Sequence, residues 1–127
     1  MAEGDGFTIK RREELESMEG SGNCTWHLVR RPLGVEAFGI NMVEIGPGGQ
    51  IPEHTEEGSG QIEVFAILEG EGKFRLNGSD HEAPAGTFVR MDPDVNRTIV
   101  NDSDAPLTAL LIGVPADSGY TAGSDWL

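Results

Sequence analysis

Short apolar segments separated by glycine, proline, asparagine or aspartate are the feature that most limits the fold of this chain. They have the length of strands and are rich in β-branched and apolar residues. They cover residues 24–31, 35–46, 61–70, 72–78, 86–91, 96–101 and 106–114. Because the connections leave no room for helical crossovers, the strands are expected to pair largely antiparallel. The pattern therefore predicts an all-β fold, a small antiparallel β-barrel or sandwich.

The domain organisation follows from the length of 127 residues, which suffices for one hydrophobic core and not for two. We expect a single domain, with a core barrel over about 22–115 and peripheral segments at 1–21 and 116–127. The only helical candidate is the charged stretch 12–18, which is either one turn or a loop. In the C-terminal tail, Trp126 and Leu127 either dock on the body or stay mobile.

One segment, 61–68, is apolar on both of its faces. Alternation places Glu63, Phe65 and Ile67 on one side, and it places Val64, Ala66 and Leu68 on the other. A strand of this kind has to be covered on both faces. We expect the second cover to be either the N-terminal segment or the other subunit of a homodimer.

The charge balance limits the partners. Twenty-two acidic and nine basic residues give a formal net charge of −13, which repels phosphate backbones and anionic lipids. Nucleic acid and membranes are therefore not expected as partners, although such acidity can also be a salt adaptation of the host. No apolar leader or spanning segment is evident, which predicts a cytoplasmic protein. Cys24, the single cysteine, forms no intrachain disulfide and is expected to be an inert strand residue.

Candidate site residues gather in "GGQIPEHTEEGSGQIEVFAILEGEG", residues 48–72. Residues two apart in an extended chain point the same way, so His54 and Glu56 are expected to face inward together. If Gly58, Ser59 and Gly60 form a turn, Glu63 shares the inward side. His27 and His81, by contrast, have polar neighbours and are expected to be surface or hydrogen-bonded histidines.

Two stretches of the chain resemble the motifs of the cupin family. The first family motif has a glycine, five residues, His-x-His, a glutamate and, after six residues, a glycine. Here Gly48 precedes "HTE" at 54–56, followed by Glu63 and Gly70. The second motif is matched by Gly78, five residues, "PAG" at 84–86, and later "DPDVNRTIVN", which ends at Asn101. The resemblance implies a jelly-roll barrel, also called a double-stranded β-helix, and it implies that homodimers are common.

The family usually holds one divalent transition metal with two histidines and a glutamate from the first motif and a histidine from the second. By this resemblance the metal candidates are His54, Glu56 and Glu63, for manganese, iron, nickel or zinc. Glutamate replaces the second histidine, and Arg97 stands at the last histidine position. A guanidinium stays protonated and has no free lone pair for a metal. Arg97 is therefore expected to form an ion pair with Glu56 or Glu63 in place of the metal.

Three functions remain open. The first is a barrel that binds a small organic molecule. Its expected contact residues are His54, Glu56, Glu63, Phe65, Ile67, Phe74 and Arg97. The second is an enzyme acting on a small organic acid, either a metal-dependent dioxygenase or a metal-free isomerase or epimerase with His54 as its acid and base. The third is a structural or regulatory module with a fully packed interior.

Overall fold

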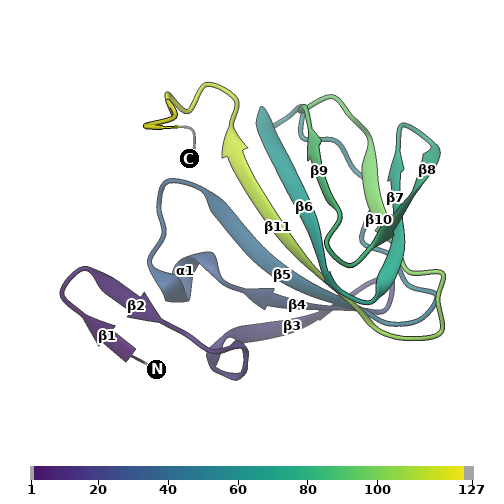
Figure 1. The fold of residues 1–127 in the computed structure, drawn as a ribbon, viewed down its shortest axis with the longest axis horizontal. Coiled ribbons are helices and arrows are strands. Elements are labelled where there is room, and N and C mark those ends of the chain that lie inside the picture. Colours follow the sequence, from purple (N-terminus) through teal and green to yellow (C-terminus); the bar gives the residue numbers. More distant parts are fainter. Residues whose placement is uncertain (1, 125–127) are drawn as a thin grey trace.

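The computed structural model describes residues 2–124 and shows a barrel-like body with a hairpin extending from it (Figure 1). The strands are β1 (Ala2–Gly4), β2 (Phe7–Ile9), β3 (Glu16–Gly20), β4 (Cys24–Leu28), β5 (Gly39–Ile45), β6 (Gln61–Glu69), β7 (Glu71–Leu76), β8 (Ser79–Pro84), β9 (Phe88–Met91), β10 (Arg97–Val100) and β11 (Leu107–Pro115). The helical elements are a 3-10 turn, η1 (Arg12–Glu14), and α1 (Arg30–Leu33).

Two antiparallel sheets form the body. The larger has six strands in the order β3-β4-β5-β11-β6-β9, and the smaller has three in the order β10-β7-β8. Every strand pair in the described residues is antiparallel. The core lies between the sheets and includes Val43, Phe65, Phe74 and Ile99, none of them more than 2% exposed. The predicted all-β antiparallel fold is confirmed.

The register defines the inner face of the large sheet, because residues opposite one another in antiparallel strands share a face. Glu63 pairs with Gly113 of β11 and with Met91 of β9, and Phe65 pairs with Leu111. Phe65 and Met91 are buried core residues, so Glu63 belongs to the core-facing side of β6. The predicted inward position of this carboxylate is thereby confirmed.

Two local predictions are met only in part. Of the helical candidate 12–18, only Arg12–Glu14 form a turn, and Glu16–Gly20 are instead strand β3, paired with β4 at the edge of the large sheet. The strand expected over 24–31 ends at Leu28 and is followed by α1. Pro32 fits that short helix because the first turn needs no amide donor from it. Gly34 ends the helix with a φ of 80°.

The sequence pattern missed β8, whose residues "SDHEAP" are mostly polar and exposed. It pairs with β7 alone, at the edge of the small sheet. A strand with one partner and a single buried residue, Ala83, lacks the apolar alternation by which strands are recognised. The turn before it has positive φ at both Asn77 (50°) and Gly78 (82°), as a type I′ turn requires.

The outer face of β6 is apolar and partly open. Ala66 is 4% exposed, Val64 is half-buried, and Leu68 is 47% exposed. The neighbouring strands extend this surface, since Val64 lies opposite Ile112, and Ala66 lies opposite both Leu110 and Phe88.

Within the described residues, no helix is long and apolar enough to cross a membrane.

Candidate functional site

His54, Glu56 and Glu63 converge from two adjoining parts of the chain. Glu63 comes from β6, whereas His54 and Glu56 come from the loop that precedes it. Backbone hydrogen bonds hold that loop in place: His54 exchanges two with Arg97 of β10, at 3.1 and 2.9 Å, and the Glu56 amide donates to the Pro93 carbonyl at 2.8 Å. The expected grouping of these three side chains is present in the structure.

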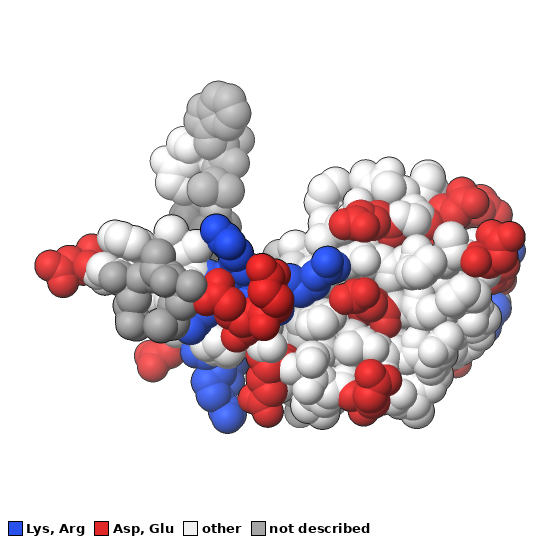
Figure 2. Space-filling model, turned by 90° about the horizontal axis from the view of Figure 1, so that it is seen from below, with Lys and Arg blue, Asp and Glu red and all other residues white. Residues whose placement is uncertain are grey.

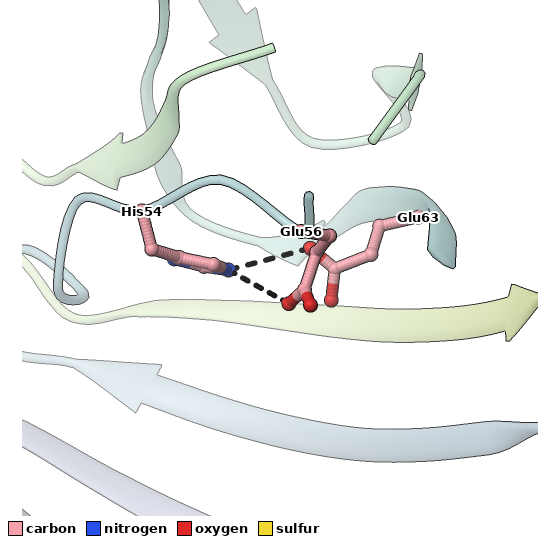
Figure 3. A group of neighbouring side chains, drawn as sticks. All are labelled: His54, Glu56 and Glu63. Atoms are coloured by element: carbon pink, nitrogen blue, oxygen red, sulfur yellow. Dashed lines mark ion pairs between the residues drawn. The ribbon is translucent and has the colours of Figure 1, made fainter. Parts of the chain in front are cut away.

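Close contacts link the imidazole of His54 to both carboxylates (Figure 3). His54 Nε2 lies 3.2 Å from Glu56 Oε1 and 3.5 Å from Glu63 Oε1. The other oxygen of Glu56, Oε2, accepts a hydrogen bond from the Ser59 hydroxyl at 2.6 Å. The side chains are 35%, 21% and 13% exposed for His54, Glu56 and Glu63, so the cluster opens to solvent on the histidine side.

The backbone selects the tautomer of His54. Its Nδ1 lies 2.9 Å from the carbonyl oxygen of Pro52, which can only accept, so Nδ1 carries a proton. In the neutral imidazole, Nε2 therefore presents a lone pair to two carboxylate oxygens. Three acceptors cannot satisfy one another, so a proton or a bound cation has to lie between them.

Arg97 supplies a fixed positive charge beside this cluster. Its side chain is fully buried, and Nη1 donates to Glu63 Oε1 at 2.8 Å. The remaining nitrogens are also occupied: Nε donates to the Val95 carbonyl at 2.8 Å and Nη2 to the Asp92 carbonyl at 2.5 Å. The predicted ion pair between Arg97 and Glu63 is confirmed.

The donor set fits a transition metal only in part. His54 Nε2 and one oxygen each of Glu56 and Glu63 lie within 4.8 Å of one another, and the bond from His54 Nδ1 to a carbonyl is typical of metal-ligating histidines. The Arg97 guanidinium, however, already binds the Glu63 oxygen that faces His54. The guanidinium lies 2.8 Å from Glu63 Oε1, so it would repel a divalent ion bound to that oxygen and compete with the ion for it. The residues present therefore do not fit a tightly held metal.

A pocket of about 210 Å³ lies next to the cluster, and we call it the His54 pocket. Its lining comprises Trp26, Gly39, Ile40, Asn41, His54, Gln61, Glu63, Leu111 and Gly113. Of the residues expected from the sequence, only His54 and Glu63 are among them. Phe65, Ile67 and Phe74 are instead core residues at most 2% exposed, with the rings of Phe65 and Phe74 6.5 Å apart.

The polar lining residues Asn41 and Gln61 were missed by the sequence reasoning. They come from β5 and β6, and only the pairing of both strands with β11 brings them to one pocket. The alternation of side chains along a strand could have identified Gln61, because it stands two residues before Glu63 and therefore lies on the same face of β6.

The remaining singled-out residues lie outside the cluster. His27 is 9% exposed and its Nε2 contacts Glu44 at 2.6 Å, whereas His81 is exposed on β8. The side chain of Cys24 is buried, and burial raises the pKa of its thiol, so it stays protonated and unreactive at neutral pH. On the small sheet, the hydrogen bond from Arg75 lowers the pKa of Asp80.

Comparison with known proteins decides the family. Residues 41–113, more than half of the chain, match the family model described as Cupin domain. The chain belongs to the cupin family. This cupin is 25% identical over 119 residues to a protein of Thermotoga maritima named oxalate-binding protein, covering 88% of this chain and 97% of the relative.

Solved structures agree with the fold. A predicted oxalate decarboxylase from Thermotoga maritima superposes with a TM-score of 0.74 at 24% identity, covering 85% of this chain and 99% of the other. A cupin-superfamily sugar phosphate isomerase from Silicibacter pomeroyi gives a TM-score of 0.72 at 20% identity, covering 86% and 76% of the two chains. At these identities the likeness shows the fold alone, and different activities occur on it.

Proposed function

We propose that this cupin binds a small organic molecule in the His54 pocket without a resident transition metal. The observation that carries the proposal is the buried ion pair of Arg97 with Glu63, which stands where the family pattern has a metal ligand. With a second proton on the His54 imidazole, at Nε2, His54 and Arg97 would be the two positive groups that balance the carboxylates of Glu56 and Glu63, and the cluster would be neutral. The name of the Thermotoga maritima relative, oxalate-binding protein, supports small-molecule binding.

The pocket suits a small polar ligand. Trp26, Ile40 and Leu111 supply apolar wall, while His54, Glu63, Asn41 and Gln61 supply hydrogen-bonding groups. Such a mixture of apolar lining and a few convergent polar groups is typical of small-molecule sites. Phe65, Ile67 and Phe74, which the sequence suggested as the apolar wall, are core residues and do not line the pocket.

A pocket-filling variant tests the proposal. A Cβ at Gly39 would meet only the Gly113 carbonyl oxygen, at 3.6 Å. The Gly39→Leu variant is therefore expected to fold, with its leucine side chain filling the pocket. Ligand-observed NMR with oxalate, glycolate, 3-hydroxypropionate, 4-hydroxybutyrate and 1,4-butanediol should reveal at least one binder to the wild type, unchanged after chelator treatment. Binding should disappear in Gly39→Leu and persist in Gly58→Ala, whose added Cβ meets nothing within 4 Å.

Two results would overturn the proposal. Absence of binding by every probe at millimolar concentration would argue against a ligand pocket. Binding that disappears with chelator and returns with a stoichiometric metal would show that the cluster holds an ion after all, which is the requirement for the dioxygenase alternative.

Metal-free acid–base catalysis is the second candidate, favoured by the geometry of His54. The Pro52 carbonyl fixes Nδ1–H, so Nε2 is the nitrogen free to exchange a proton with a ligand, and Glu56 lies 3.2 Å from it. An isomerase or epimerase would need such a group. Proton exchange between a bound hydroxy acid and deuterated solvent, abolished in His54→Asn, would support this role, whereas unchanged exchange in the variant would exclude it.

The homodimer and the cytoplasmic location belong to the same proposal. The open apolar face of β6 supports a second copy as its cover. The net charge of −13 supports a freely diffusing protein with neither nucleic acid nor membrane as partner.

A further inference from the structure

Arg97 cannot bind an anionic group of a ligand. Its side chain has no exposed surface, and Nε, Nη1 and Nη2 each donate to a protein oxygen. The ionisable side chains that line the His54 pocket are consequently the carboxylate of Glu63 and the imidazole of His54. If the pocket takes an organic acid, the positive charge for its carboxylate has to come from another residue.

Two grooves adjoin the His54 pocket. One, of about 280 Å³, shares Gly39, Gln61 and Gly113 with the pocket. The other, of about 460 Å³, shares Asn41 with it. We call them the Gln61 groove and the Asn41 groove. Arg30 of α1 lines both grooves, so it borders both of the hollows that adjoin the His54 pocket.

The guanidinium of Arg30 is available for a ligand. The residue is exposed, and the only bond that its side chain makes to the described residues is a long one, 3.4 Å, from Nη1 to the Val35 carbonyl. The Gln61 groove also holds Glu36, and the Asn41 groove also holds Glu16 and Arg31. Of these charged residues, only Arg30 borders both grooves.

The charge distribution makes this region unusual in the molecule. The chain has only nine basic residues, and five of them are Lys10, Arg11, Arg12, Arg30 and Arg31. Figure 2 shows Lys and Arg gathered between the body and the end of the molecule that carries β1 and β2, with Asp and Glu among them and over the rest of the body. On a strongly acidic protein, a group of basic side chains of this kind offers a small anion a local partner.

We propose that Arg30 binds the carboxylate of a small organic acid whose opposite end carries a hydroxyl or amino group. That donor end would enter the His54 pocket, where Glu63 and Gln61 offer acceptor oxygens. This inference rests on the proposed small-molecule function and names its ligand class. It assigns to Arg30 the role of anion anchor. A ligand with an anion at both ends, such as oxalate, would place one carboxylate against Glu63 and is disfavoured.

Paired charge-removing variants test the assignment. Arg31 is the matched control for Arg30, because it lies next to it in α1 and carries the same charge but lines the Asn41 groove alone. Affinities of glycolate, 3-hydroxypropionate and 4-hydroxybutyrate are measured by calorimetry for the wild type, Arg30→Gln and Arg31→Gln, with 1,4-butanediol as the uncharged probe.

We expect the best hydroxy acid to bind the wild type about tenfold or more tightly than the diol, as loss of a charge-assisted hydrogen bond costs about 1.4 kcal/mol. Arg30→Gln should remove that advantage and leave diol affinity unchanged, while Arg31→Gln should change hydroxy-acid affinity less than about threefold. If the two substitutions lower hydroxy-acid affinity equally, Arg30 acts only through the overall charge of the region, and the assignment is overturned. If the probes bind the wild type and Arg30→Gln equally well but do not bind Gly39→Leu, the assignment of Arg30 is overturned and the pocket function stands. No binding at all would overturn both.

Discussion

At the scale of single residues, Arg97 and Glu63 depend on each other for stability. Arg97 has no exposed side-chain surface, and Glu63 is the only carboxylate bonded to it in the described residues. Taking away one member of a buried ion pair leaves an uncompensated charge, whose cost exceeds the net value of the pair itself.

Glu63→Leu should therefore lower the free energy of unfolding by about 3–5 kcal/mol. Glu63→Gln keeps an oxygen acceptor for Arg97 and should cost less. Glu56→Leu is the control, because Glu56 is more exposed and bonds to Ser59 rather than to Arg97. Urea denaturation of the three variants measures the differences, and equal losses for Glu56→Leu and Glu63→Leu would contradict the dependence.

At the scale of elements, the connection between β6 and β7 requires glycine. Gly70 has a φ of 79°, and a Cβ there would lie 2.5 Å from the Pro106 carbonyl oxygen and 3.1 Å from Leu107 Cα. Both neighbours are backbone atoms, which cannot rotate away. The close approach lies where the end of β6 meets the start of β11, its neighbour in the large sheet.

Three glycine-to-alanine variants separate the two effects. Gly70→Ala combines a left-handed backbone with a clash and should cost about 2 kcal/mol or more. Gly60→Ala has a φ of 67° but open space, and should cost about 1 kcal/mol. Gly58→Ala has neither, and should stay within about 0.5 kcal/mol of the wild type. Thermal unfolding that ranks Gly58→Ala with Gly70→Ala would refute this explanation.

The accuracy of the sequence predictions also differs between elements. The core strands β5, β6, β7 and β11 alternate or are continuously apolar, and so they were predictable from the chain. The edge strands β3 and β8 were not, because every residue of β3 and most of β8 are exposed, so burial did not select their side chains.

The candidate site was predictable where it follows the chain and not where it depends on the fold. His54, Glu56 and Glu63 stand within ten residues of one another, and Arg97 was identified by its place in a motif. Asn41, Gln61 and Arg30 reach the same end of the barrel only through strand pairing and the turn at α1. The expected wall of Phe65, Ile67 and Phe74 was placed from strand parity alone. Parity gives the face of a strand but not the depth at which the pocket ends.

At the scale of the whole molecule, the outer face of the large sheet predicts self-association. Phe88 of β9 and Leu68 of β6 are 72% and 47% exposed, and Phe88 lies opposite Ala66 of β6. Exposed apolar surface of this kind is typical of an interface, and a two-fold dimer would cover the same patch on both copies.

Light scattering at micromolar concentration should therefore give a dimer. The double variant Leu68→Glu/Phe88→Glu should be a folded monomer, because two carboxylates would be buried at the interface of each subunit. Met18→Glu, at a 51% exposed position on β3, is the control and should remain dimeric. A monomeric wild type would contradict the prediction.

The central claim is that the ion pair of Arg97 occupies the place of a metal, and a metal titration of wild type and Arg97→His tests it most directly. Replacing the guanidinium with an imidazole removes the competing cation, frees Glu63 and adds a nitrogen ligand. After chelator treatment and a check of thermal unfolding, calorimetry with nickel or manganese should show affinity more than tenfold higher in Arg97→His, or about 1.4 kcal/mol. Equal affinities, or a tightly metallated wild type that loses its ion on the substitution, would contradict the claim.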